Sequence, residues 1–162
     1  MFGRRRRRRG ERGASAVEFA LVVPVLVALL LGIVDYGIIF TDSVSTRNGV
    51  REAARKGVVS NFGTAPCAGT TMASLACQTK EEIDSLSGTS PLVKISAPNG
   101  WVKGGPLIVC SVILDPGVIN FVPTPAEVKS RVELSIETAA VPPTGGTSYQ
   151  DSGWPAGTST WC

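Results

Sequence analysis

The longest pattern in the chain is an uninterrupted apolar stretch close to its N-terminus. Every residue from Phe19 to Val34 is apolar, Gly or Pro, and residues 37–40 continue the stretch after two polar positions. A helix rises about 1.5 Å per residue, so this stretch would extend about 33 Å, enough to cross the hydrocarbon core of a bilayer. We therefore expect a transmembrane helix over about residues 17–40.

After residue 41 the pattern stays helical but becomes polar. Apolar and charged residues recur in steps of three and four, and they lead into a segment of high helix propensity, Arg51-Glu52-Ala53-Ala54-Arg55-Lys56. We expect one helix over residues 14–57, with Gly57 as its C-cap because glycine readily adopts the left-handed conformation used there. The outer half of this helix would pack under the rest of the chain.

Residues 58–141 contain three runs that are typical of strands. Apolar runs at residues 92–96 and 107–114 are bounded by turn signals rich in Gly, Pro and Asn. A third run, residues 128–136, alternates apolar and polar positions, so one face should be buried and the other wet. Together these runs predict a three- or four-stranded antiparallel sheet packed on the outer part of the helix.

Two further segments complete the plan of the fold. The pattern Thr79-Lys80-Glu81-Glu82 is a capping box, which predicts that a short helix begins there. Residues 142–162 are rich in Gly, Pro, Ser and Thr, which predicts an irregular tail over the surface. The expected fold class is α+β: a long N-terminal transmembrane helix continues into a small antiparallel β-sheet domain outside the membrane.

The strongest charge lies ahead of the apolar stretch. Residues 1–13 contain seven arginines and one acid, Glu11, and so carry a net side-chain charge of +6. Basic residues that flank a span stay in the cytoplasm, so we expect a cytoplasmic N-terminus and an extracytoplasmic C-terminal domain. Nucleic-acid binding or a twin-arginine export signal are alternative interpretations. Because no basic pattern recurs downstream, we expect a lipid bilayer and no nucleic acid as the partner.

An ordinary secretory signal peptide does not fit this N-terminus. The apolar run is longer than the usual h-region of about 7 to 15 residues, and no small-x-small cleavage site follows it. We therefore expect the span to remain attached, which makes the protein a single-pass membrane protein.

All four cysteines, Cys67, Cys77, Cys110 and Cys162, follow the predicted span. An even number of cysteines in an oxidising compartment favours two disulfides. We favour Cys67 with Cys77, which closes a short loop, and Cys110 with Cys162, which fixes the tail to a strand. The two other pairings remain open. A zinc site is the rival interpretation, and the lack of any histidine or C-x-x-C pair argues against it.

The chain offers little for catalysis. It contains no histidine, and we find no constellation of Asp, Glu, Lys, Tyr or Cys that would support general acid–base chemistry. The acidic group Glu81, Glu82 and Asp84 fits a solvated helix better than a calcium or catalytic site. The three tryptophans fit the cover of a small core better than a glycan-binding patch. We expect no enzymatic activity and no cofactor or metal.

A single carboxylate, Glu18, lies at the start of the apolar stretch. An ionised acid inside a bilayer costs about 2.5 to 3.5 kcal/mol on insertion scales, so such a residue is a candidate for function. The alternative is a side chain that only reaches back to the interface. Nearby Pro24 removes a helical hydrogen bond to the carbonyl of Ala20 and predicts a kink, with or without a role in packing. Glu18 and Pro24 are the candidate assembly residues.

The residues around Glu18 resemble the processing site of type IV pilin-like proteins of the tight-adherence (Tad/Flp) class. Gly13 is followed by four residues, then by Glu18 and the aromatic Phe19, between a basic leader and an apolar helix. Within that class the chain is similar to TadE-like minor pseudopilins over roughly its first 60 residues. The similarity also covers Ala14 to Leu21, Pro24, Asp35-Tyr36-Gly37 and Arg51 to Arg55. Beyond them, only the general plan of a small β-rich exterior domain is similar.

This resemblance implies a pilin-like fold and a role in assembling Tad/Flp-type pili for surface adhesion or secretion. It also implies that a prepilin peptidase cuts after Gly13 and leaves Ala14 as the new N-terminus. The other implied partners are pilin and pseudopilin subunits and the assembly machinery in the membrane. No Lys or Arg lies between Ala14 and Arg47, so we expect the freed amine to neutralise Glu18 of the same or a neighbouring subunit. A membrane-anchored exterior binding module outside any pilus is the alternative.

Overall fold

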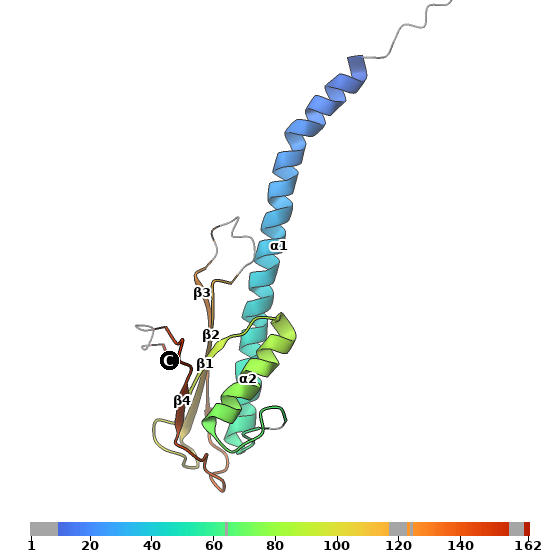
Figure 1. The fold of residues 1–162 in the computed structure, drawn as a ribbon. Coiled ribbons are helices and arrows are strands. Elements are labelled where there is room, and N and C mark those ends of the chain that lie inside the picture. The colour runs from blue at the N-terminus through green and yellow to red at the C-terminus, as the bar shows by residue number, and fades with distance from the viewer. Residues whose placement is uncertain (1–9, 64, 117–122, 124, 156–160) are drawn as a thin grey trace, which may run out of the picture.

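In a computed structural model of the chain, a long helix rises from a small α+β head (Figure 1). The structure describes residues 10–63, 65–116, 123, 125–155 and 161–162, so the arginines at positions 4–9 lie outside the described residues. The elements are α1 (Gly10–Val58), α2 (Met72–Ser87), β1 (Leu92–Ser96), β2 (Pro106–Leu114), β3 (Glu127–Ser135) and β4 (Ser148–Gln150). The expected α+β class is confirmed.

Helix α1 is continuous for 49 residues, as the sequence predicts, but Gly57 is not its C-cap. Ser60 adopts the left-handed conformation instead, with φ of 59°. Its amide donates to the carbonyl of Gly57 (2.8 Å), and the amide of Asn61 donates to the carbonyl of Lys56 (2.9 Å). This pair of bonds is the Schellman arrangement that ends a helix. The prediction for Gly57 was wrong because Gly57 lies one turn before the end of the helix, where its lack of a side chain is needed for close packing.

The four strands form one antiparallel sheet in the order β3-β2-β1-β4. Strands β1, β2 and β3 match the three predicted runs to within one residue at each end. The short β4 arises from the segment that was expected to be irregular, and pairs with β1 at Ile95 and Tyr149. Helices α1 and α2 cover one face of the sheet (Figure 1). The last residues of the chain cover the other face, where Trp154 packs on Cys110 and Val112.

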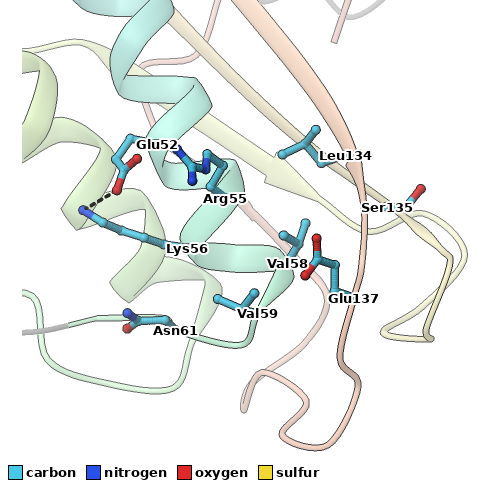
Figure 2. Close-up of a pocket in the computed structure, with 9 residues that line it drawn as sticks. All are labelled: Glu52, Arg55, Lys56, Val58, Val59, Asn61, Leu134, Ser135 and Glu137. Carbon is cyan, nitrogen blue, oxygen red and sulfur yellow. Dashed lines mark ion pairs between the residues drawn. The ribbon is translucent and has the colours of Figure 1, made fainter.

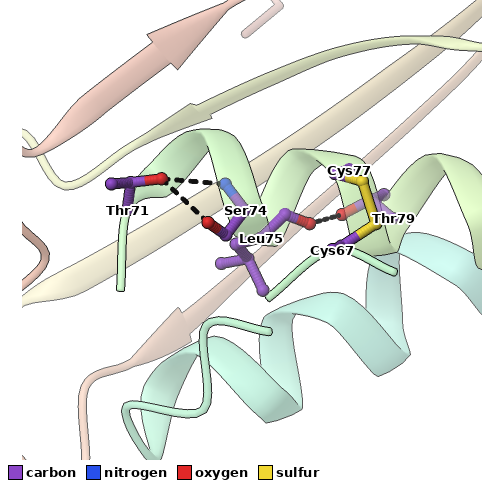
Figure 3. Close-up of a disulfide and its surroundings, with 6 residues drawn as sticks. All are labelled: Cys67, Thr71, Ser74, Leu75, Cys77 and Thr79. Atoms are coloured by element: carbon purple, nitrogen blue, oxygen red, sulfur yellow. Dashed lines mark hydrogen bonds between the residues drawn. A yellow bond between two sulfur atoms is a disulfide. The ribbon is translucent and has the colours of Figure 1, made fainter. Parts of the chain in front are cut away.

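Helix α2 begins seven residues before the predicted capping box. The real N-cap is Thr71, whose hydroxyl accepts a hydrogen bond from the amide of Ser74 (3.0 Å). Thr79 lies inside the helix and is fully buried, and its hydroxyl donates to the carbonyl of Leu75 (2.7 Å; Figure 3). The capping-box interpretation was wrong because Thr79 belongs to the buried stripe of α2, whose members are Met72, Leu75, Ala76, Thr79 and Ile83.

Small residues on α1 allow α2 and the sheet to approach closely. Gly49, Ala53 and Gly57 recur every fourth residue and are all buried. A Cβ at position 49 would overlap Ile83 of α2, and one at position 57 would lie 2.6 Å from Leu107 Cδ2 and 2.8 Å from Leu75 Cδ2. The close packing of the head core therefore requires glycine at positions 49 and 57, where a side chain would overlap its neighbours.

Two disulfides join the cysteines in the pairing that the sequence favours. Cys67 and Cys77 link the loop before α2 to its second turn (Figure 3), with Cα atoms 5.6 Å apart. Cys110 of β2 and Cys162 link the end of the chain to the outer face of the sheet, with Cα atoms 6.2 Å apart. Each crosslink thus fixes a segment that has little regular structure of its own.

A buried carboxylate, Asp151, ties together three elements of the head. It accepts hydrogen bonds from Lys80 Nζ of α2 (2.7 Å), from the amide of Val93 in β1 (2.7 Å) and from the hydroxyl of Tyr149 in β4 (2.8 Å). Burial by itself would raise the pKa of Asp151, but the three donors outweigh it and hold the pKa below its ordinary value. The same contact with Asp151 raises the pKa of Tyr149.

Because the pKa of Asp151 is lower in the folded state, this carboxylate stabilises the head above its ordinary pKa and loses that effect as pH falls through its folded value. We expect Asp151→Asn to remove this part of the acid sensitivity, which thermal unfolding between pH 7 and pH 2 would measure. The matched control is Asp84→Asn, at an exposed position of α2. Equal acid sensitivity of the two variants would contradict the role given to Asp151.

Candidate functional site

The apolar N-terminal part of α1 is largely uncovered by the described residues of the chain. One helix among the described residues is long and apolar enough to cross a membrane, and none of its most apolar window is buried. Side chains such as Phe19 (70% exposed), Leu21 (72%) and Ile33 (68%) lie open on all sides of the helix. Soluble monomers rarely expose so large an apolar surface, so this segment requires lipid or neighbouring helices.

The head begins to cover α1 at Asp35. Ile39 packs with Ile83, Ile113 and Val128 in a small cluster of the head core. None of residues 13–34 is buried and most are exposed, and their helical length of about 33 Å is enough for one bilayer crossing. Residues 35–40 of the predicted span contact the head on one side and remain exposed on the other.

The side chain of Asp35 has no exposed surface, although this residue lies near the end of the predicted span. Asp42, two turns further along the same face of α1, is also buried and accepts a hydrogen bond from the hydroxyl of Thr89 (3.0 Å). Charged residues at the end of a span usually reach water, whereas here the head covers this face of the helix.

The bond between Gly13 and Ala14 lies near the first turn of α1, which begins at Gly10. A Cβ on Gly13 would meet nothing within 4 Å, so packing does not explain this glycine. Glycine inside a helix is less stable than alanine by about 1 kcal/mol, and helix ends fray. The backbone at Gly13 is thus well suited to open locally into the extended form that a protease cleft accepts.

Glu18 projects from the bare segment one helical turn beyond Ala14. Residues four apart lie on the same face of a helix, so the nitrogen of Ala14 and the carboxylate of Glu18 belong to one face. Val17 and Phe19 on either side are 62% and 70% exposed. The structure therefore places this acid among apolar side chains with no packing role inside its own chain.

Pro24 lies inside α1 without ending it. The N-terminal part of the helix leans away from the axis of its C-terminal part (Figure 1). This shape agrees with the expectation of a bend, since proline removes one helical hydrogen bond.

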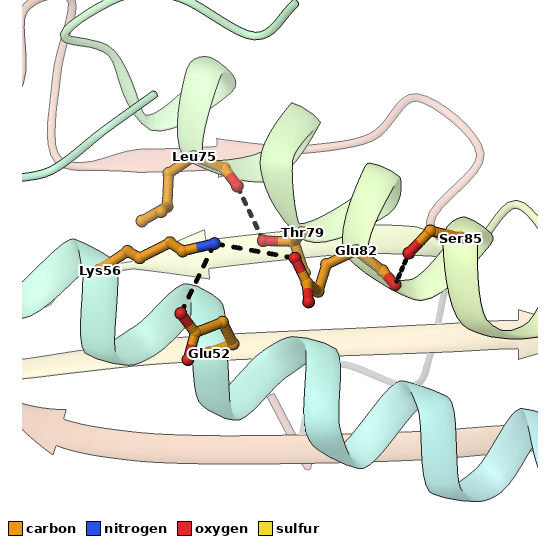
Figure 4. A network of polar contacts seen from close by, with 6 residues as sticks. All are labelled: Glu52, Lys56, Leu75, Thr79, Glu82 and Ser85. Atoms are coloured by element: carbon orange, nitrogen blue, oxygen red, sulfur yellow. Dashed lines mark hydrogen bonds and ion pairs between the residues drawn. The ribbon is translucent and has the colours of Figure 1, made fainter. Parts of the chain in front are cut away.

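Near the C-terminal end of α1, a charge network joins α1 to α2. Lys56 Nζ lies 3.6 Å from Glu52 of α1 and 3.7 Å from Glu82 of α2 (Figure 4). Sequence reasoning missed this network because Lys56 and Glu82 are 26 residues apart, and only the packing of the two helices brings them together. The residues around Lys56 also line a hollow of about 670 Å³ between the end of α1 and β3 (Figure 2).

The remaining candidates occupy structural positions. Glu81 and Asp84 lie exposed in the second half of α2 rather than at its start. Trp101 and Trp154 are at most 9% exposed and cover the core, as expected. Within the described ranges, no three His, Cys, Asp or Glu side chains are grouped so that they could hold a metal ion.

Comparison with known proteins bears on the helix alone. A family model described as TadE-like protein matches residues 13–55. Searches of the curated proteins and of the solved structures give no significant match. The matched segment starts at Gly13, includes Glu18 and Pro24, and ends three residues before α1 does.

Proposed function

We propose that this chain, a TadE-like protein by its residues 13–55, is a minor pseudopilin that takes part in the assembly of a Tad/Flp-type pilus. The match of residues 13–55 to the family model supports its association with such a pilus, and its processing, orientation and place in assembly are further parts of the proposal. The observation that carries the proposal is Glu18, an acid held open on a bare apolar helix five positions after Gly13.

The leader and the helix fit an inside-to-outside arrangement. The +6 charge of residues 1–13 would hold the N-terminus in the cytoplasm. Residues 13–34 would cross the bilayer, and the disulfide-linked head would stand in the oxidising space outside. In this arrangement, the Gly13–Ala14 bond lies at the cytoplasmic face, where a membrane-embedded prepilin peptidase can reach it.

Cleavage after Gly13 would change the chemistry of the helix end. It removes all seven leader arginines and creates an α-amino group at Ala14, which is cationic below about pH 7.7 to 8.0. That amine lies on the same helix face as Glu18, one turn away, or faces the Glu18 of a neighbour. Pairing of the two charges lowers the cost of holding the acid among apolar helices, so trimming would convert a stored monomer into one that can join a fibre.

The decisive test is the N-terminal sequence of the protein from its native host, with and without the prepilin peptidase gene. We expect Ala14 as the first residue when the peptidase is present and the intact leader when it is absent. Full assembly activity of a protein that keeps its arginines would overturn the proposal. In that case the alternative, a binding module that is merely tethered by its helix, would hold, because a tether needs no cleavage.

A further inference from the structure

A row of cations follows the seam between α1 and β3, the free edge strand of the sheet. One hollow of about 240 Å³ is lined by Arg47, Arg51, Lys129, Ser130, Arg131 and Val132. The neighbouring hollow continues the seam, and both Arg55 of α1 and Leu134 of β3 line it (Figure 2). We call Arg47, Arg51, Arg55, Lys129 and Arg131 the basic furrow.

Three cations of the basic furrow are not neutralised within the described part of the chain. Lys129 pairs with Glu127, and Arg131 pairs with Glu133 at 2.9 Å. Arg47, Arg51 and Arg55 recur every fourth residue on one exposed face of α1, and no described acid forms an ion pair with them. Like charges one turn apart repel each other. The furrow is thus arranged to receive negative charge from outside the chain.

The matching acids lie on the opposite flank of α1, on the outer face of α2. Helix α2 runs antiparallel to α1, because Leu75 lies against Gly57 and Ile83 lies against Gly49. Glu81 and Asp84 are exposed near Ile83, whereas Glu82 turns inward to Lys56. The acids Glu81 and Asp84 therefore lie at the same height along α1 as the arginines at 47–55.

We propose that the acidic outer face of α2 in one copy of this chain docks into the basic furrow of a second copy. Two copies anchored in one membrane stand at the same height, so opposite charges at equal height meet when the copies stand side by side. The two surfaces differ and occupy opposite flanks, so the contact is heterologous and can repeat from copy to copy. The inference rests on the proposed role as an assembling subunit, but it does not require removal of the leader.

Anionic lipid does not suit the furrow as an occupant. Counted from Phe40, the end of the predicted span, Arg51 and Arg55 lie about 16 and 22 Å further along the helix. Charges interact weakly beyond the Debye length of about 8 Å at physiological ionic strength. Arg51 and Arg55 thus stand above the reach of the membrane surface, at the level of neighbouring heads.

Zero-length crosslinking of the full-length protein in phosphatidylcholine vesicles tests this contact without any peptidase. A carbodiimide would join Lys129 to Glu81 or Asp84 only where the side chains touch. In a mixture of ¹⁴N- and ¹⁵N-labelled protein, we expect crosslinked peptides that contain one chain of each label. Absence of such hybrid peptides, or a Lys129 crosslink that in native membranes joins only another protein, would overturn the proposal.

Charge variants provide the specificity control. The readout is the yield of the crosslink between Lys129 and Asp84. We expect Arg51→Glu to lower this yield about fivefold or more, because it reverses one charge of the contact. High salt should also lower the yield, because salt screens exposed ion pairs. The double variant R51E/E81R should restore most of the yield, since the reversed pair again attracts. Lys103→Glu makes the same charge change at an exposed turn residue outside the furrow, and should leave the yield unchanged. Equal effects of Arg51→Glu and Lys103→Glu would reject the furrow as the docking surface.

Discussion

Replacement of Glu18 by Leu is expected to leave membrane insertion and cleavage after Gly13 intact while it blocks entry into the fibre. Insertion should become more favourable, because an acid within the span costs about 2.5 to 3.5 kcal/mol. Assembly should fail because the amine of Ala14 would then lie among apolar helices without a carboxylate. Removing one partner of a buried charge pair costs about 3 to 5 kcal/mol, a decrease of about two to four orders of magnitude in incorporation.

The measurement is the ratio of variant to wild-type protein in purified fibres when both are expressed together. Glu18→Asp keeps the charge on a shorter side chain and should retain part of the incorporation. Val17→Leu changes the neighbouring residue without touching the charge, and serves as the control for helix packing. Incorporation of Glu18→Leu at the wild-type level would reject the pairing, even if the N-terminus is found at Ala14.

Replacement of Gly49 by Val should produce the largest loss of stability in the head. A Cβ at this position would overlap Ile83, whose inner side-chain atoms cannot move aside easily. Overpacking of a tight core costs about 1 to 3 kcal/mol. For a domain of this size that corresponds to a decrease in Tm of roughly 5 to 20 °C.

Gly37 offers a matched control on the same helix. A Cβ there would meet nothing within 4 Å, so Gly37→Val should keep or slightly raise the Tm, since valine has the better helix propensity. The comparison by thermal unfolding of the two full-length variants isolates the clash from the change in propensity. Equal Tm values would mean that α2 shifts away at little cost.

Much of the architecture follows from periodicity in the sequence. The long apolar run and the steps of three and four residues predict α1 almost to its ends, and strict alternation predicts β3 because one face of that strand meets the core and the other meets water. The cysteine pairing was favoured because Cys67 and Cys77 are near in sequence and Cys110 lies in a predicted strand. These features are local, or depend on a single pattern of burial.

The remainder depends on contacts between distant segments. Thr79 satisfies the capping-box pattern, yet the hydroxyl of Thr71 starts the helix earlier, and only the packing of α2 on α1 decides between them. Gly57 fits a C-cap by residue type, yet Leu75 and Leu107 occupy the space around it. Likewise, no local signal shows that Asp151 would meet Lys80 across 71 residues. At the N-terminal end of α1, spacing alone marks Gly13 and Glu18 as candidates, whereas the arginines of the basic furrow form a recognisable surface only because β3 lies beside them.

Helix α1 is unbroken between Pro24 and Val58, so a bend at Pro24 would move the whole of the helix that follows it. The two residues are about 51 Å apart along the axis, so a bend of only 10° at the proline would carry the tip sideways by about 9 Å. Val50 and Ala54 of that same rod lie at the centre of the core and are fully buried. A small bend at Pro24 would therefore swing the entire head as a rigid body.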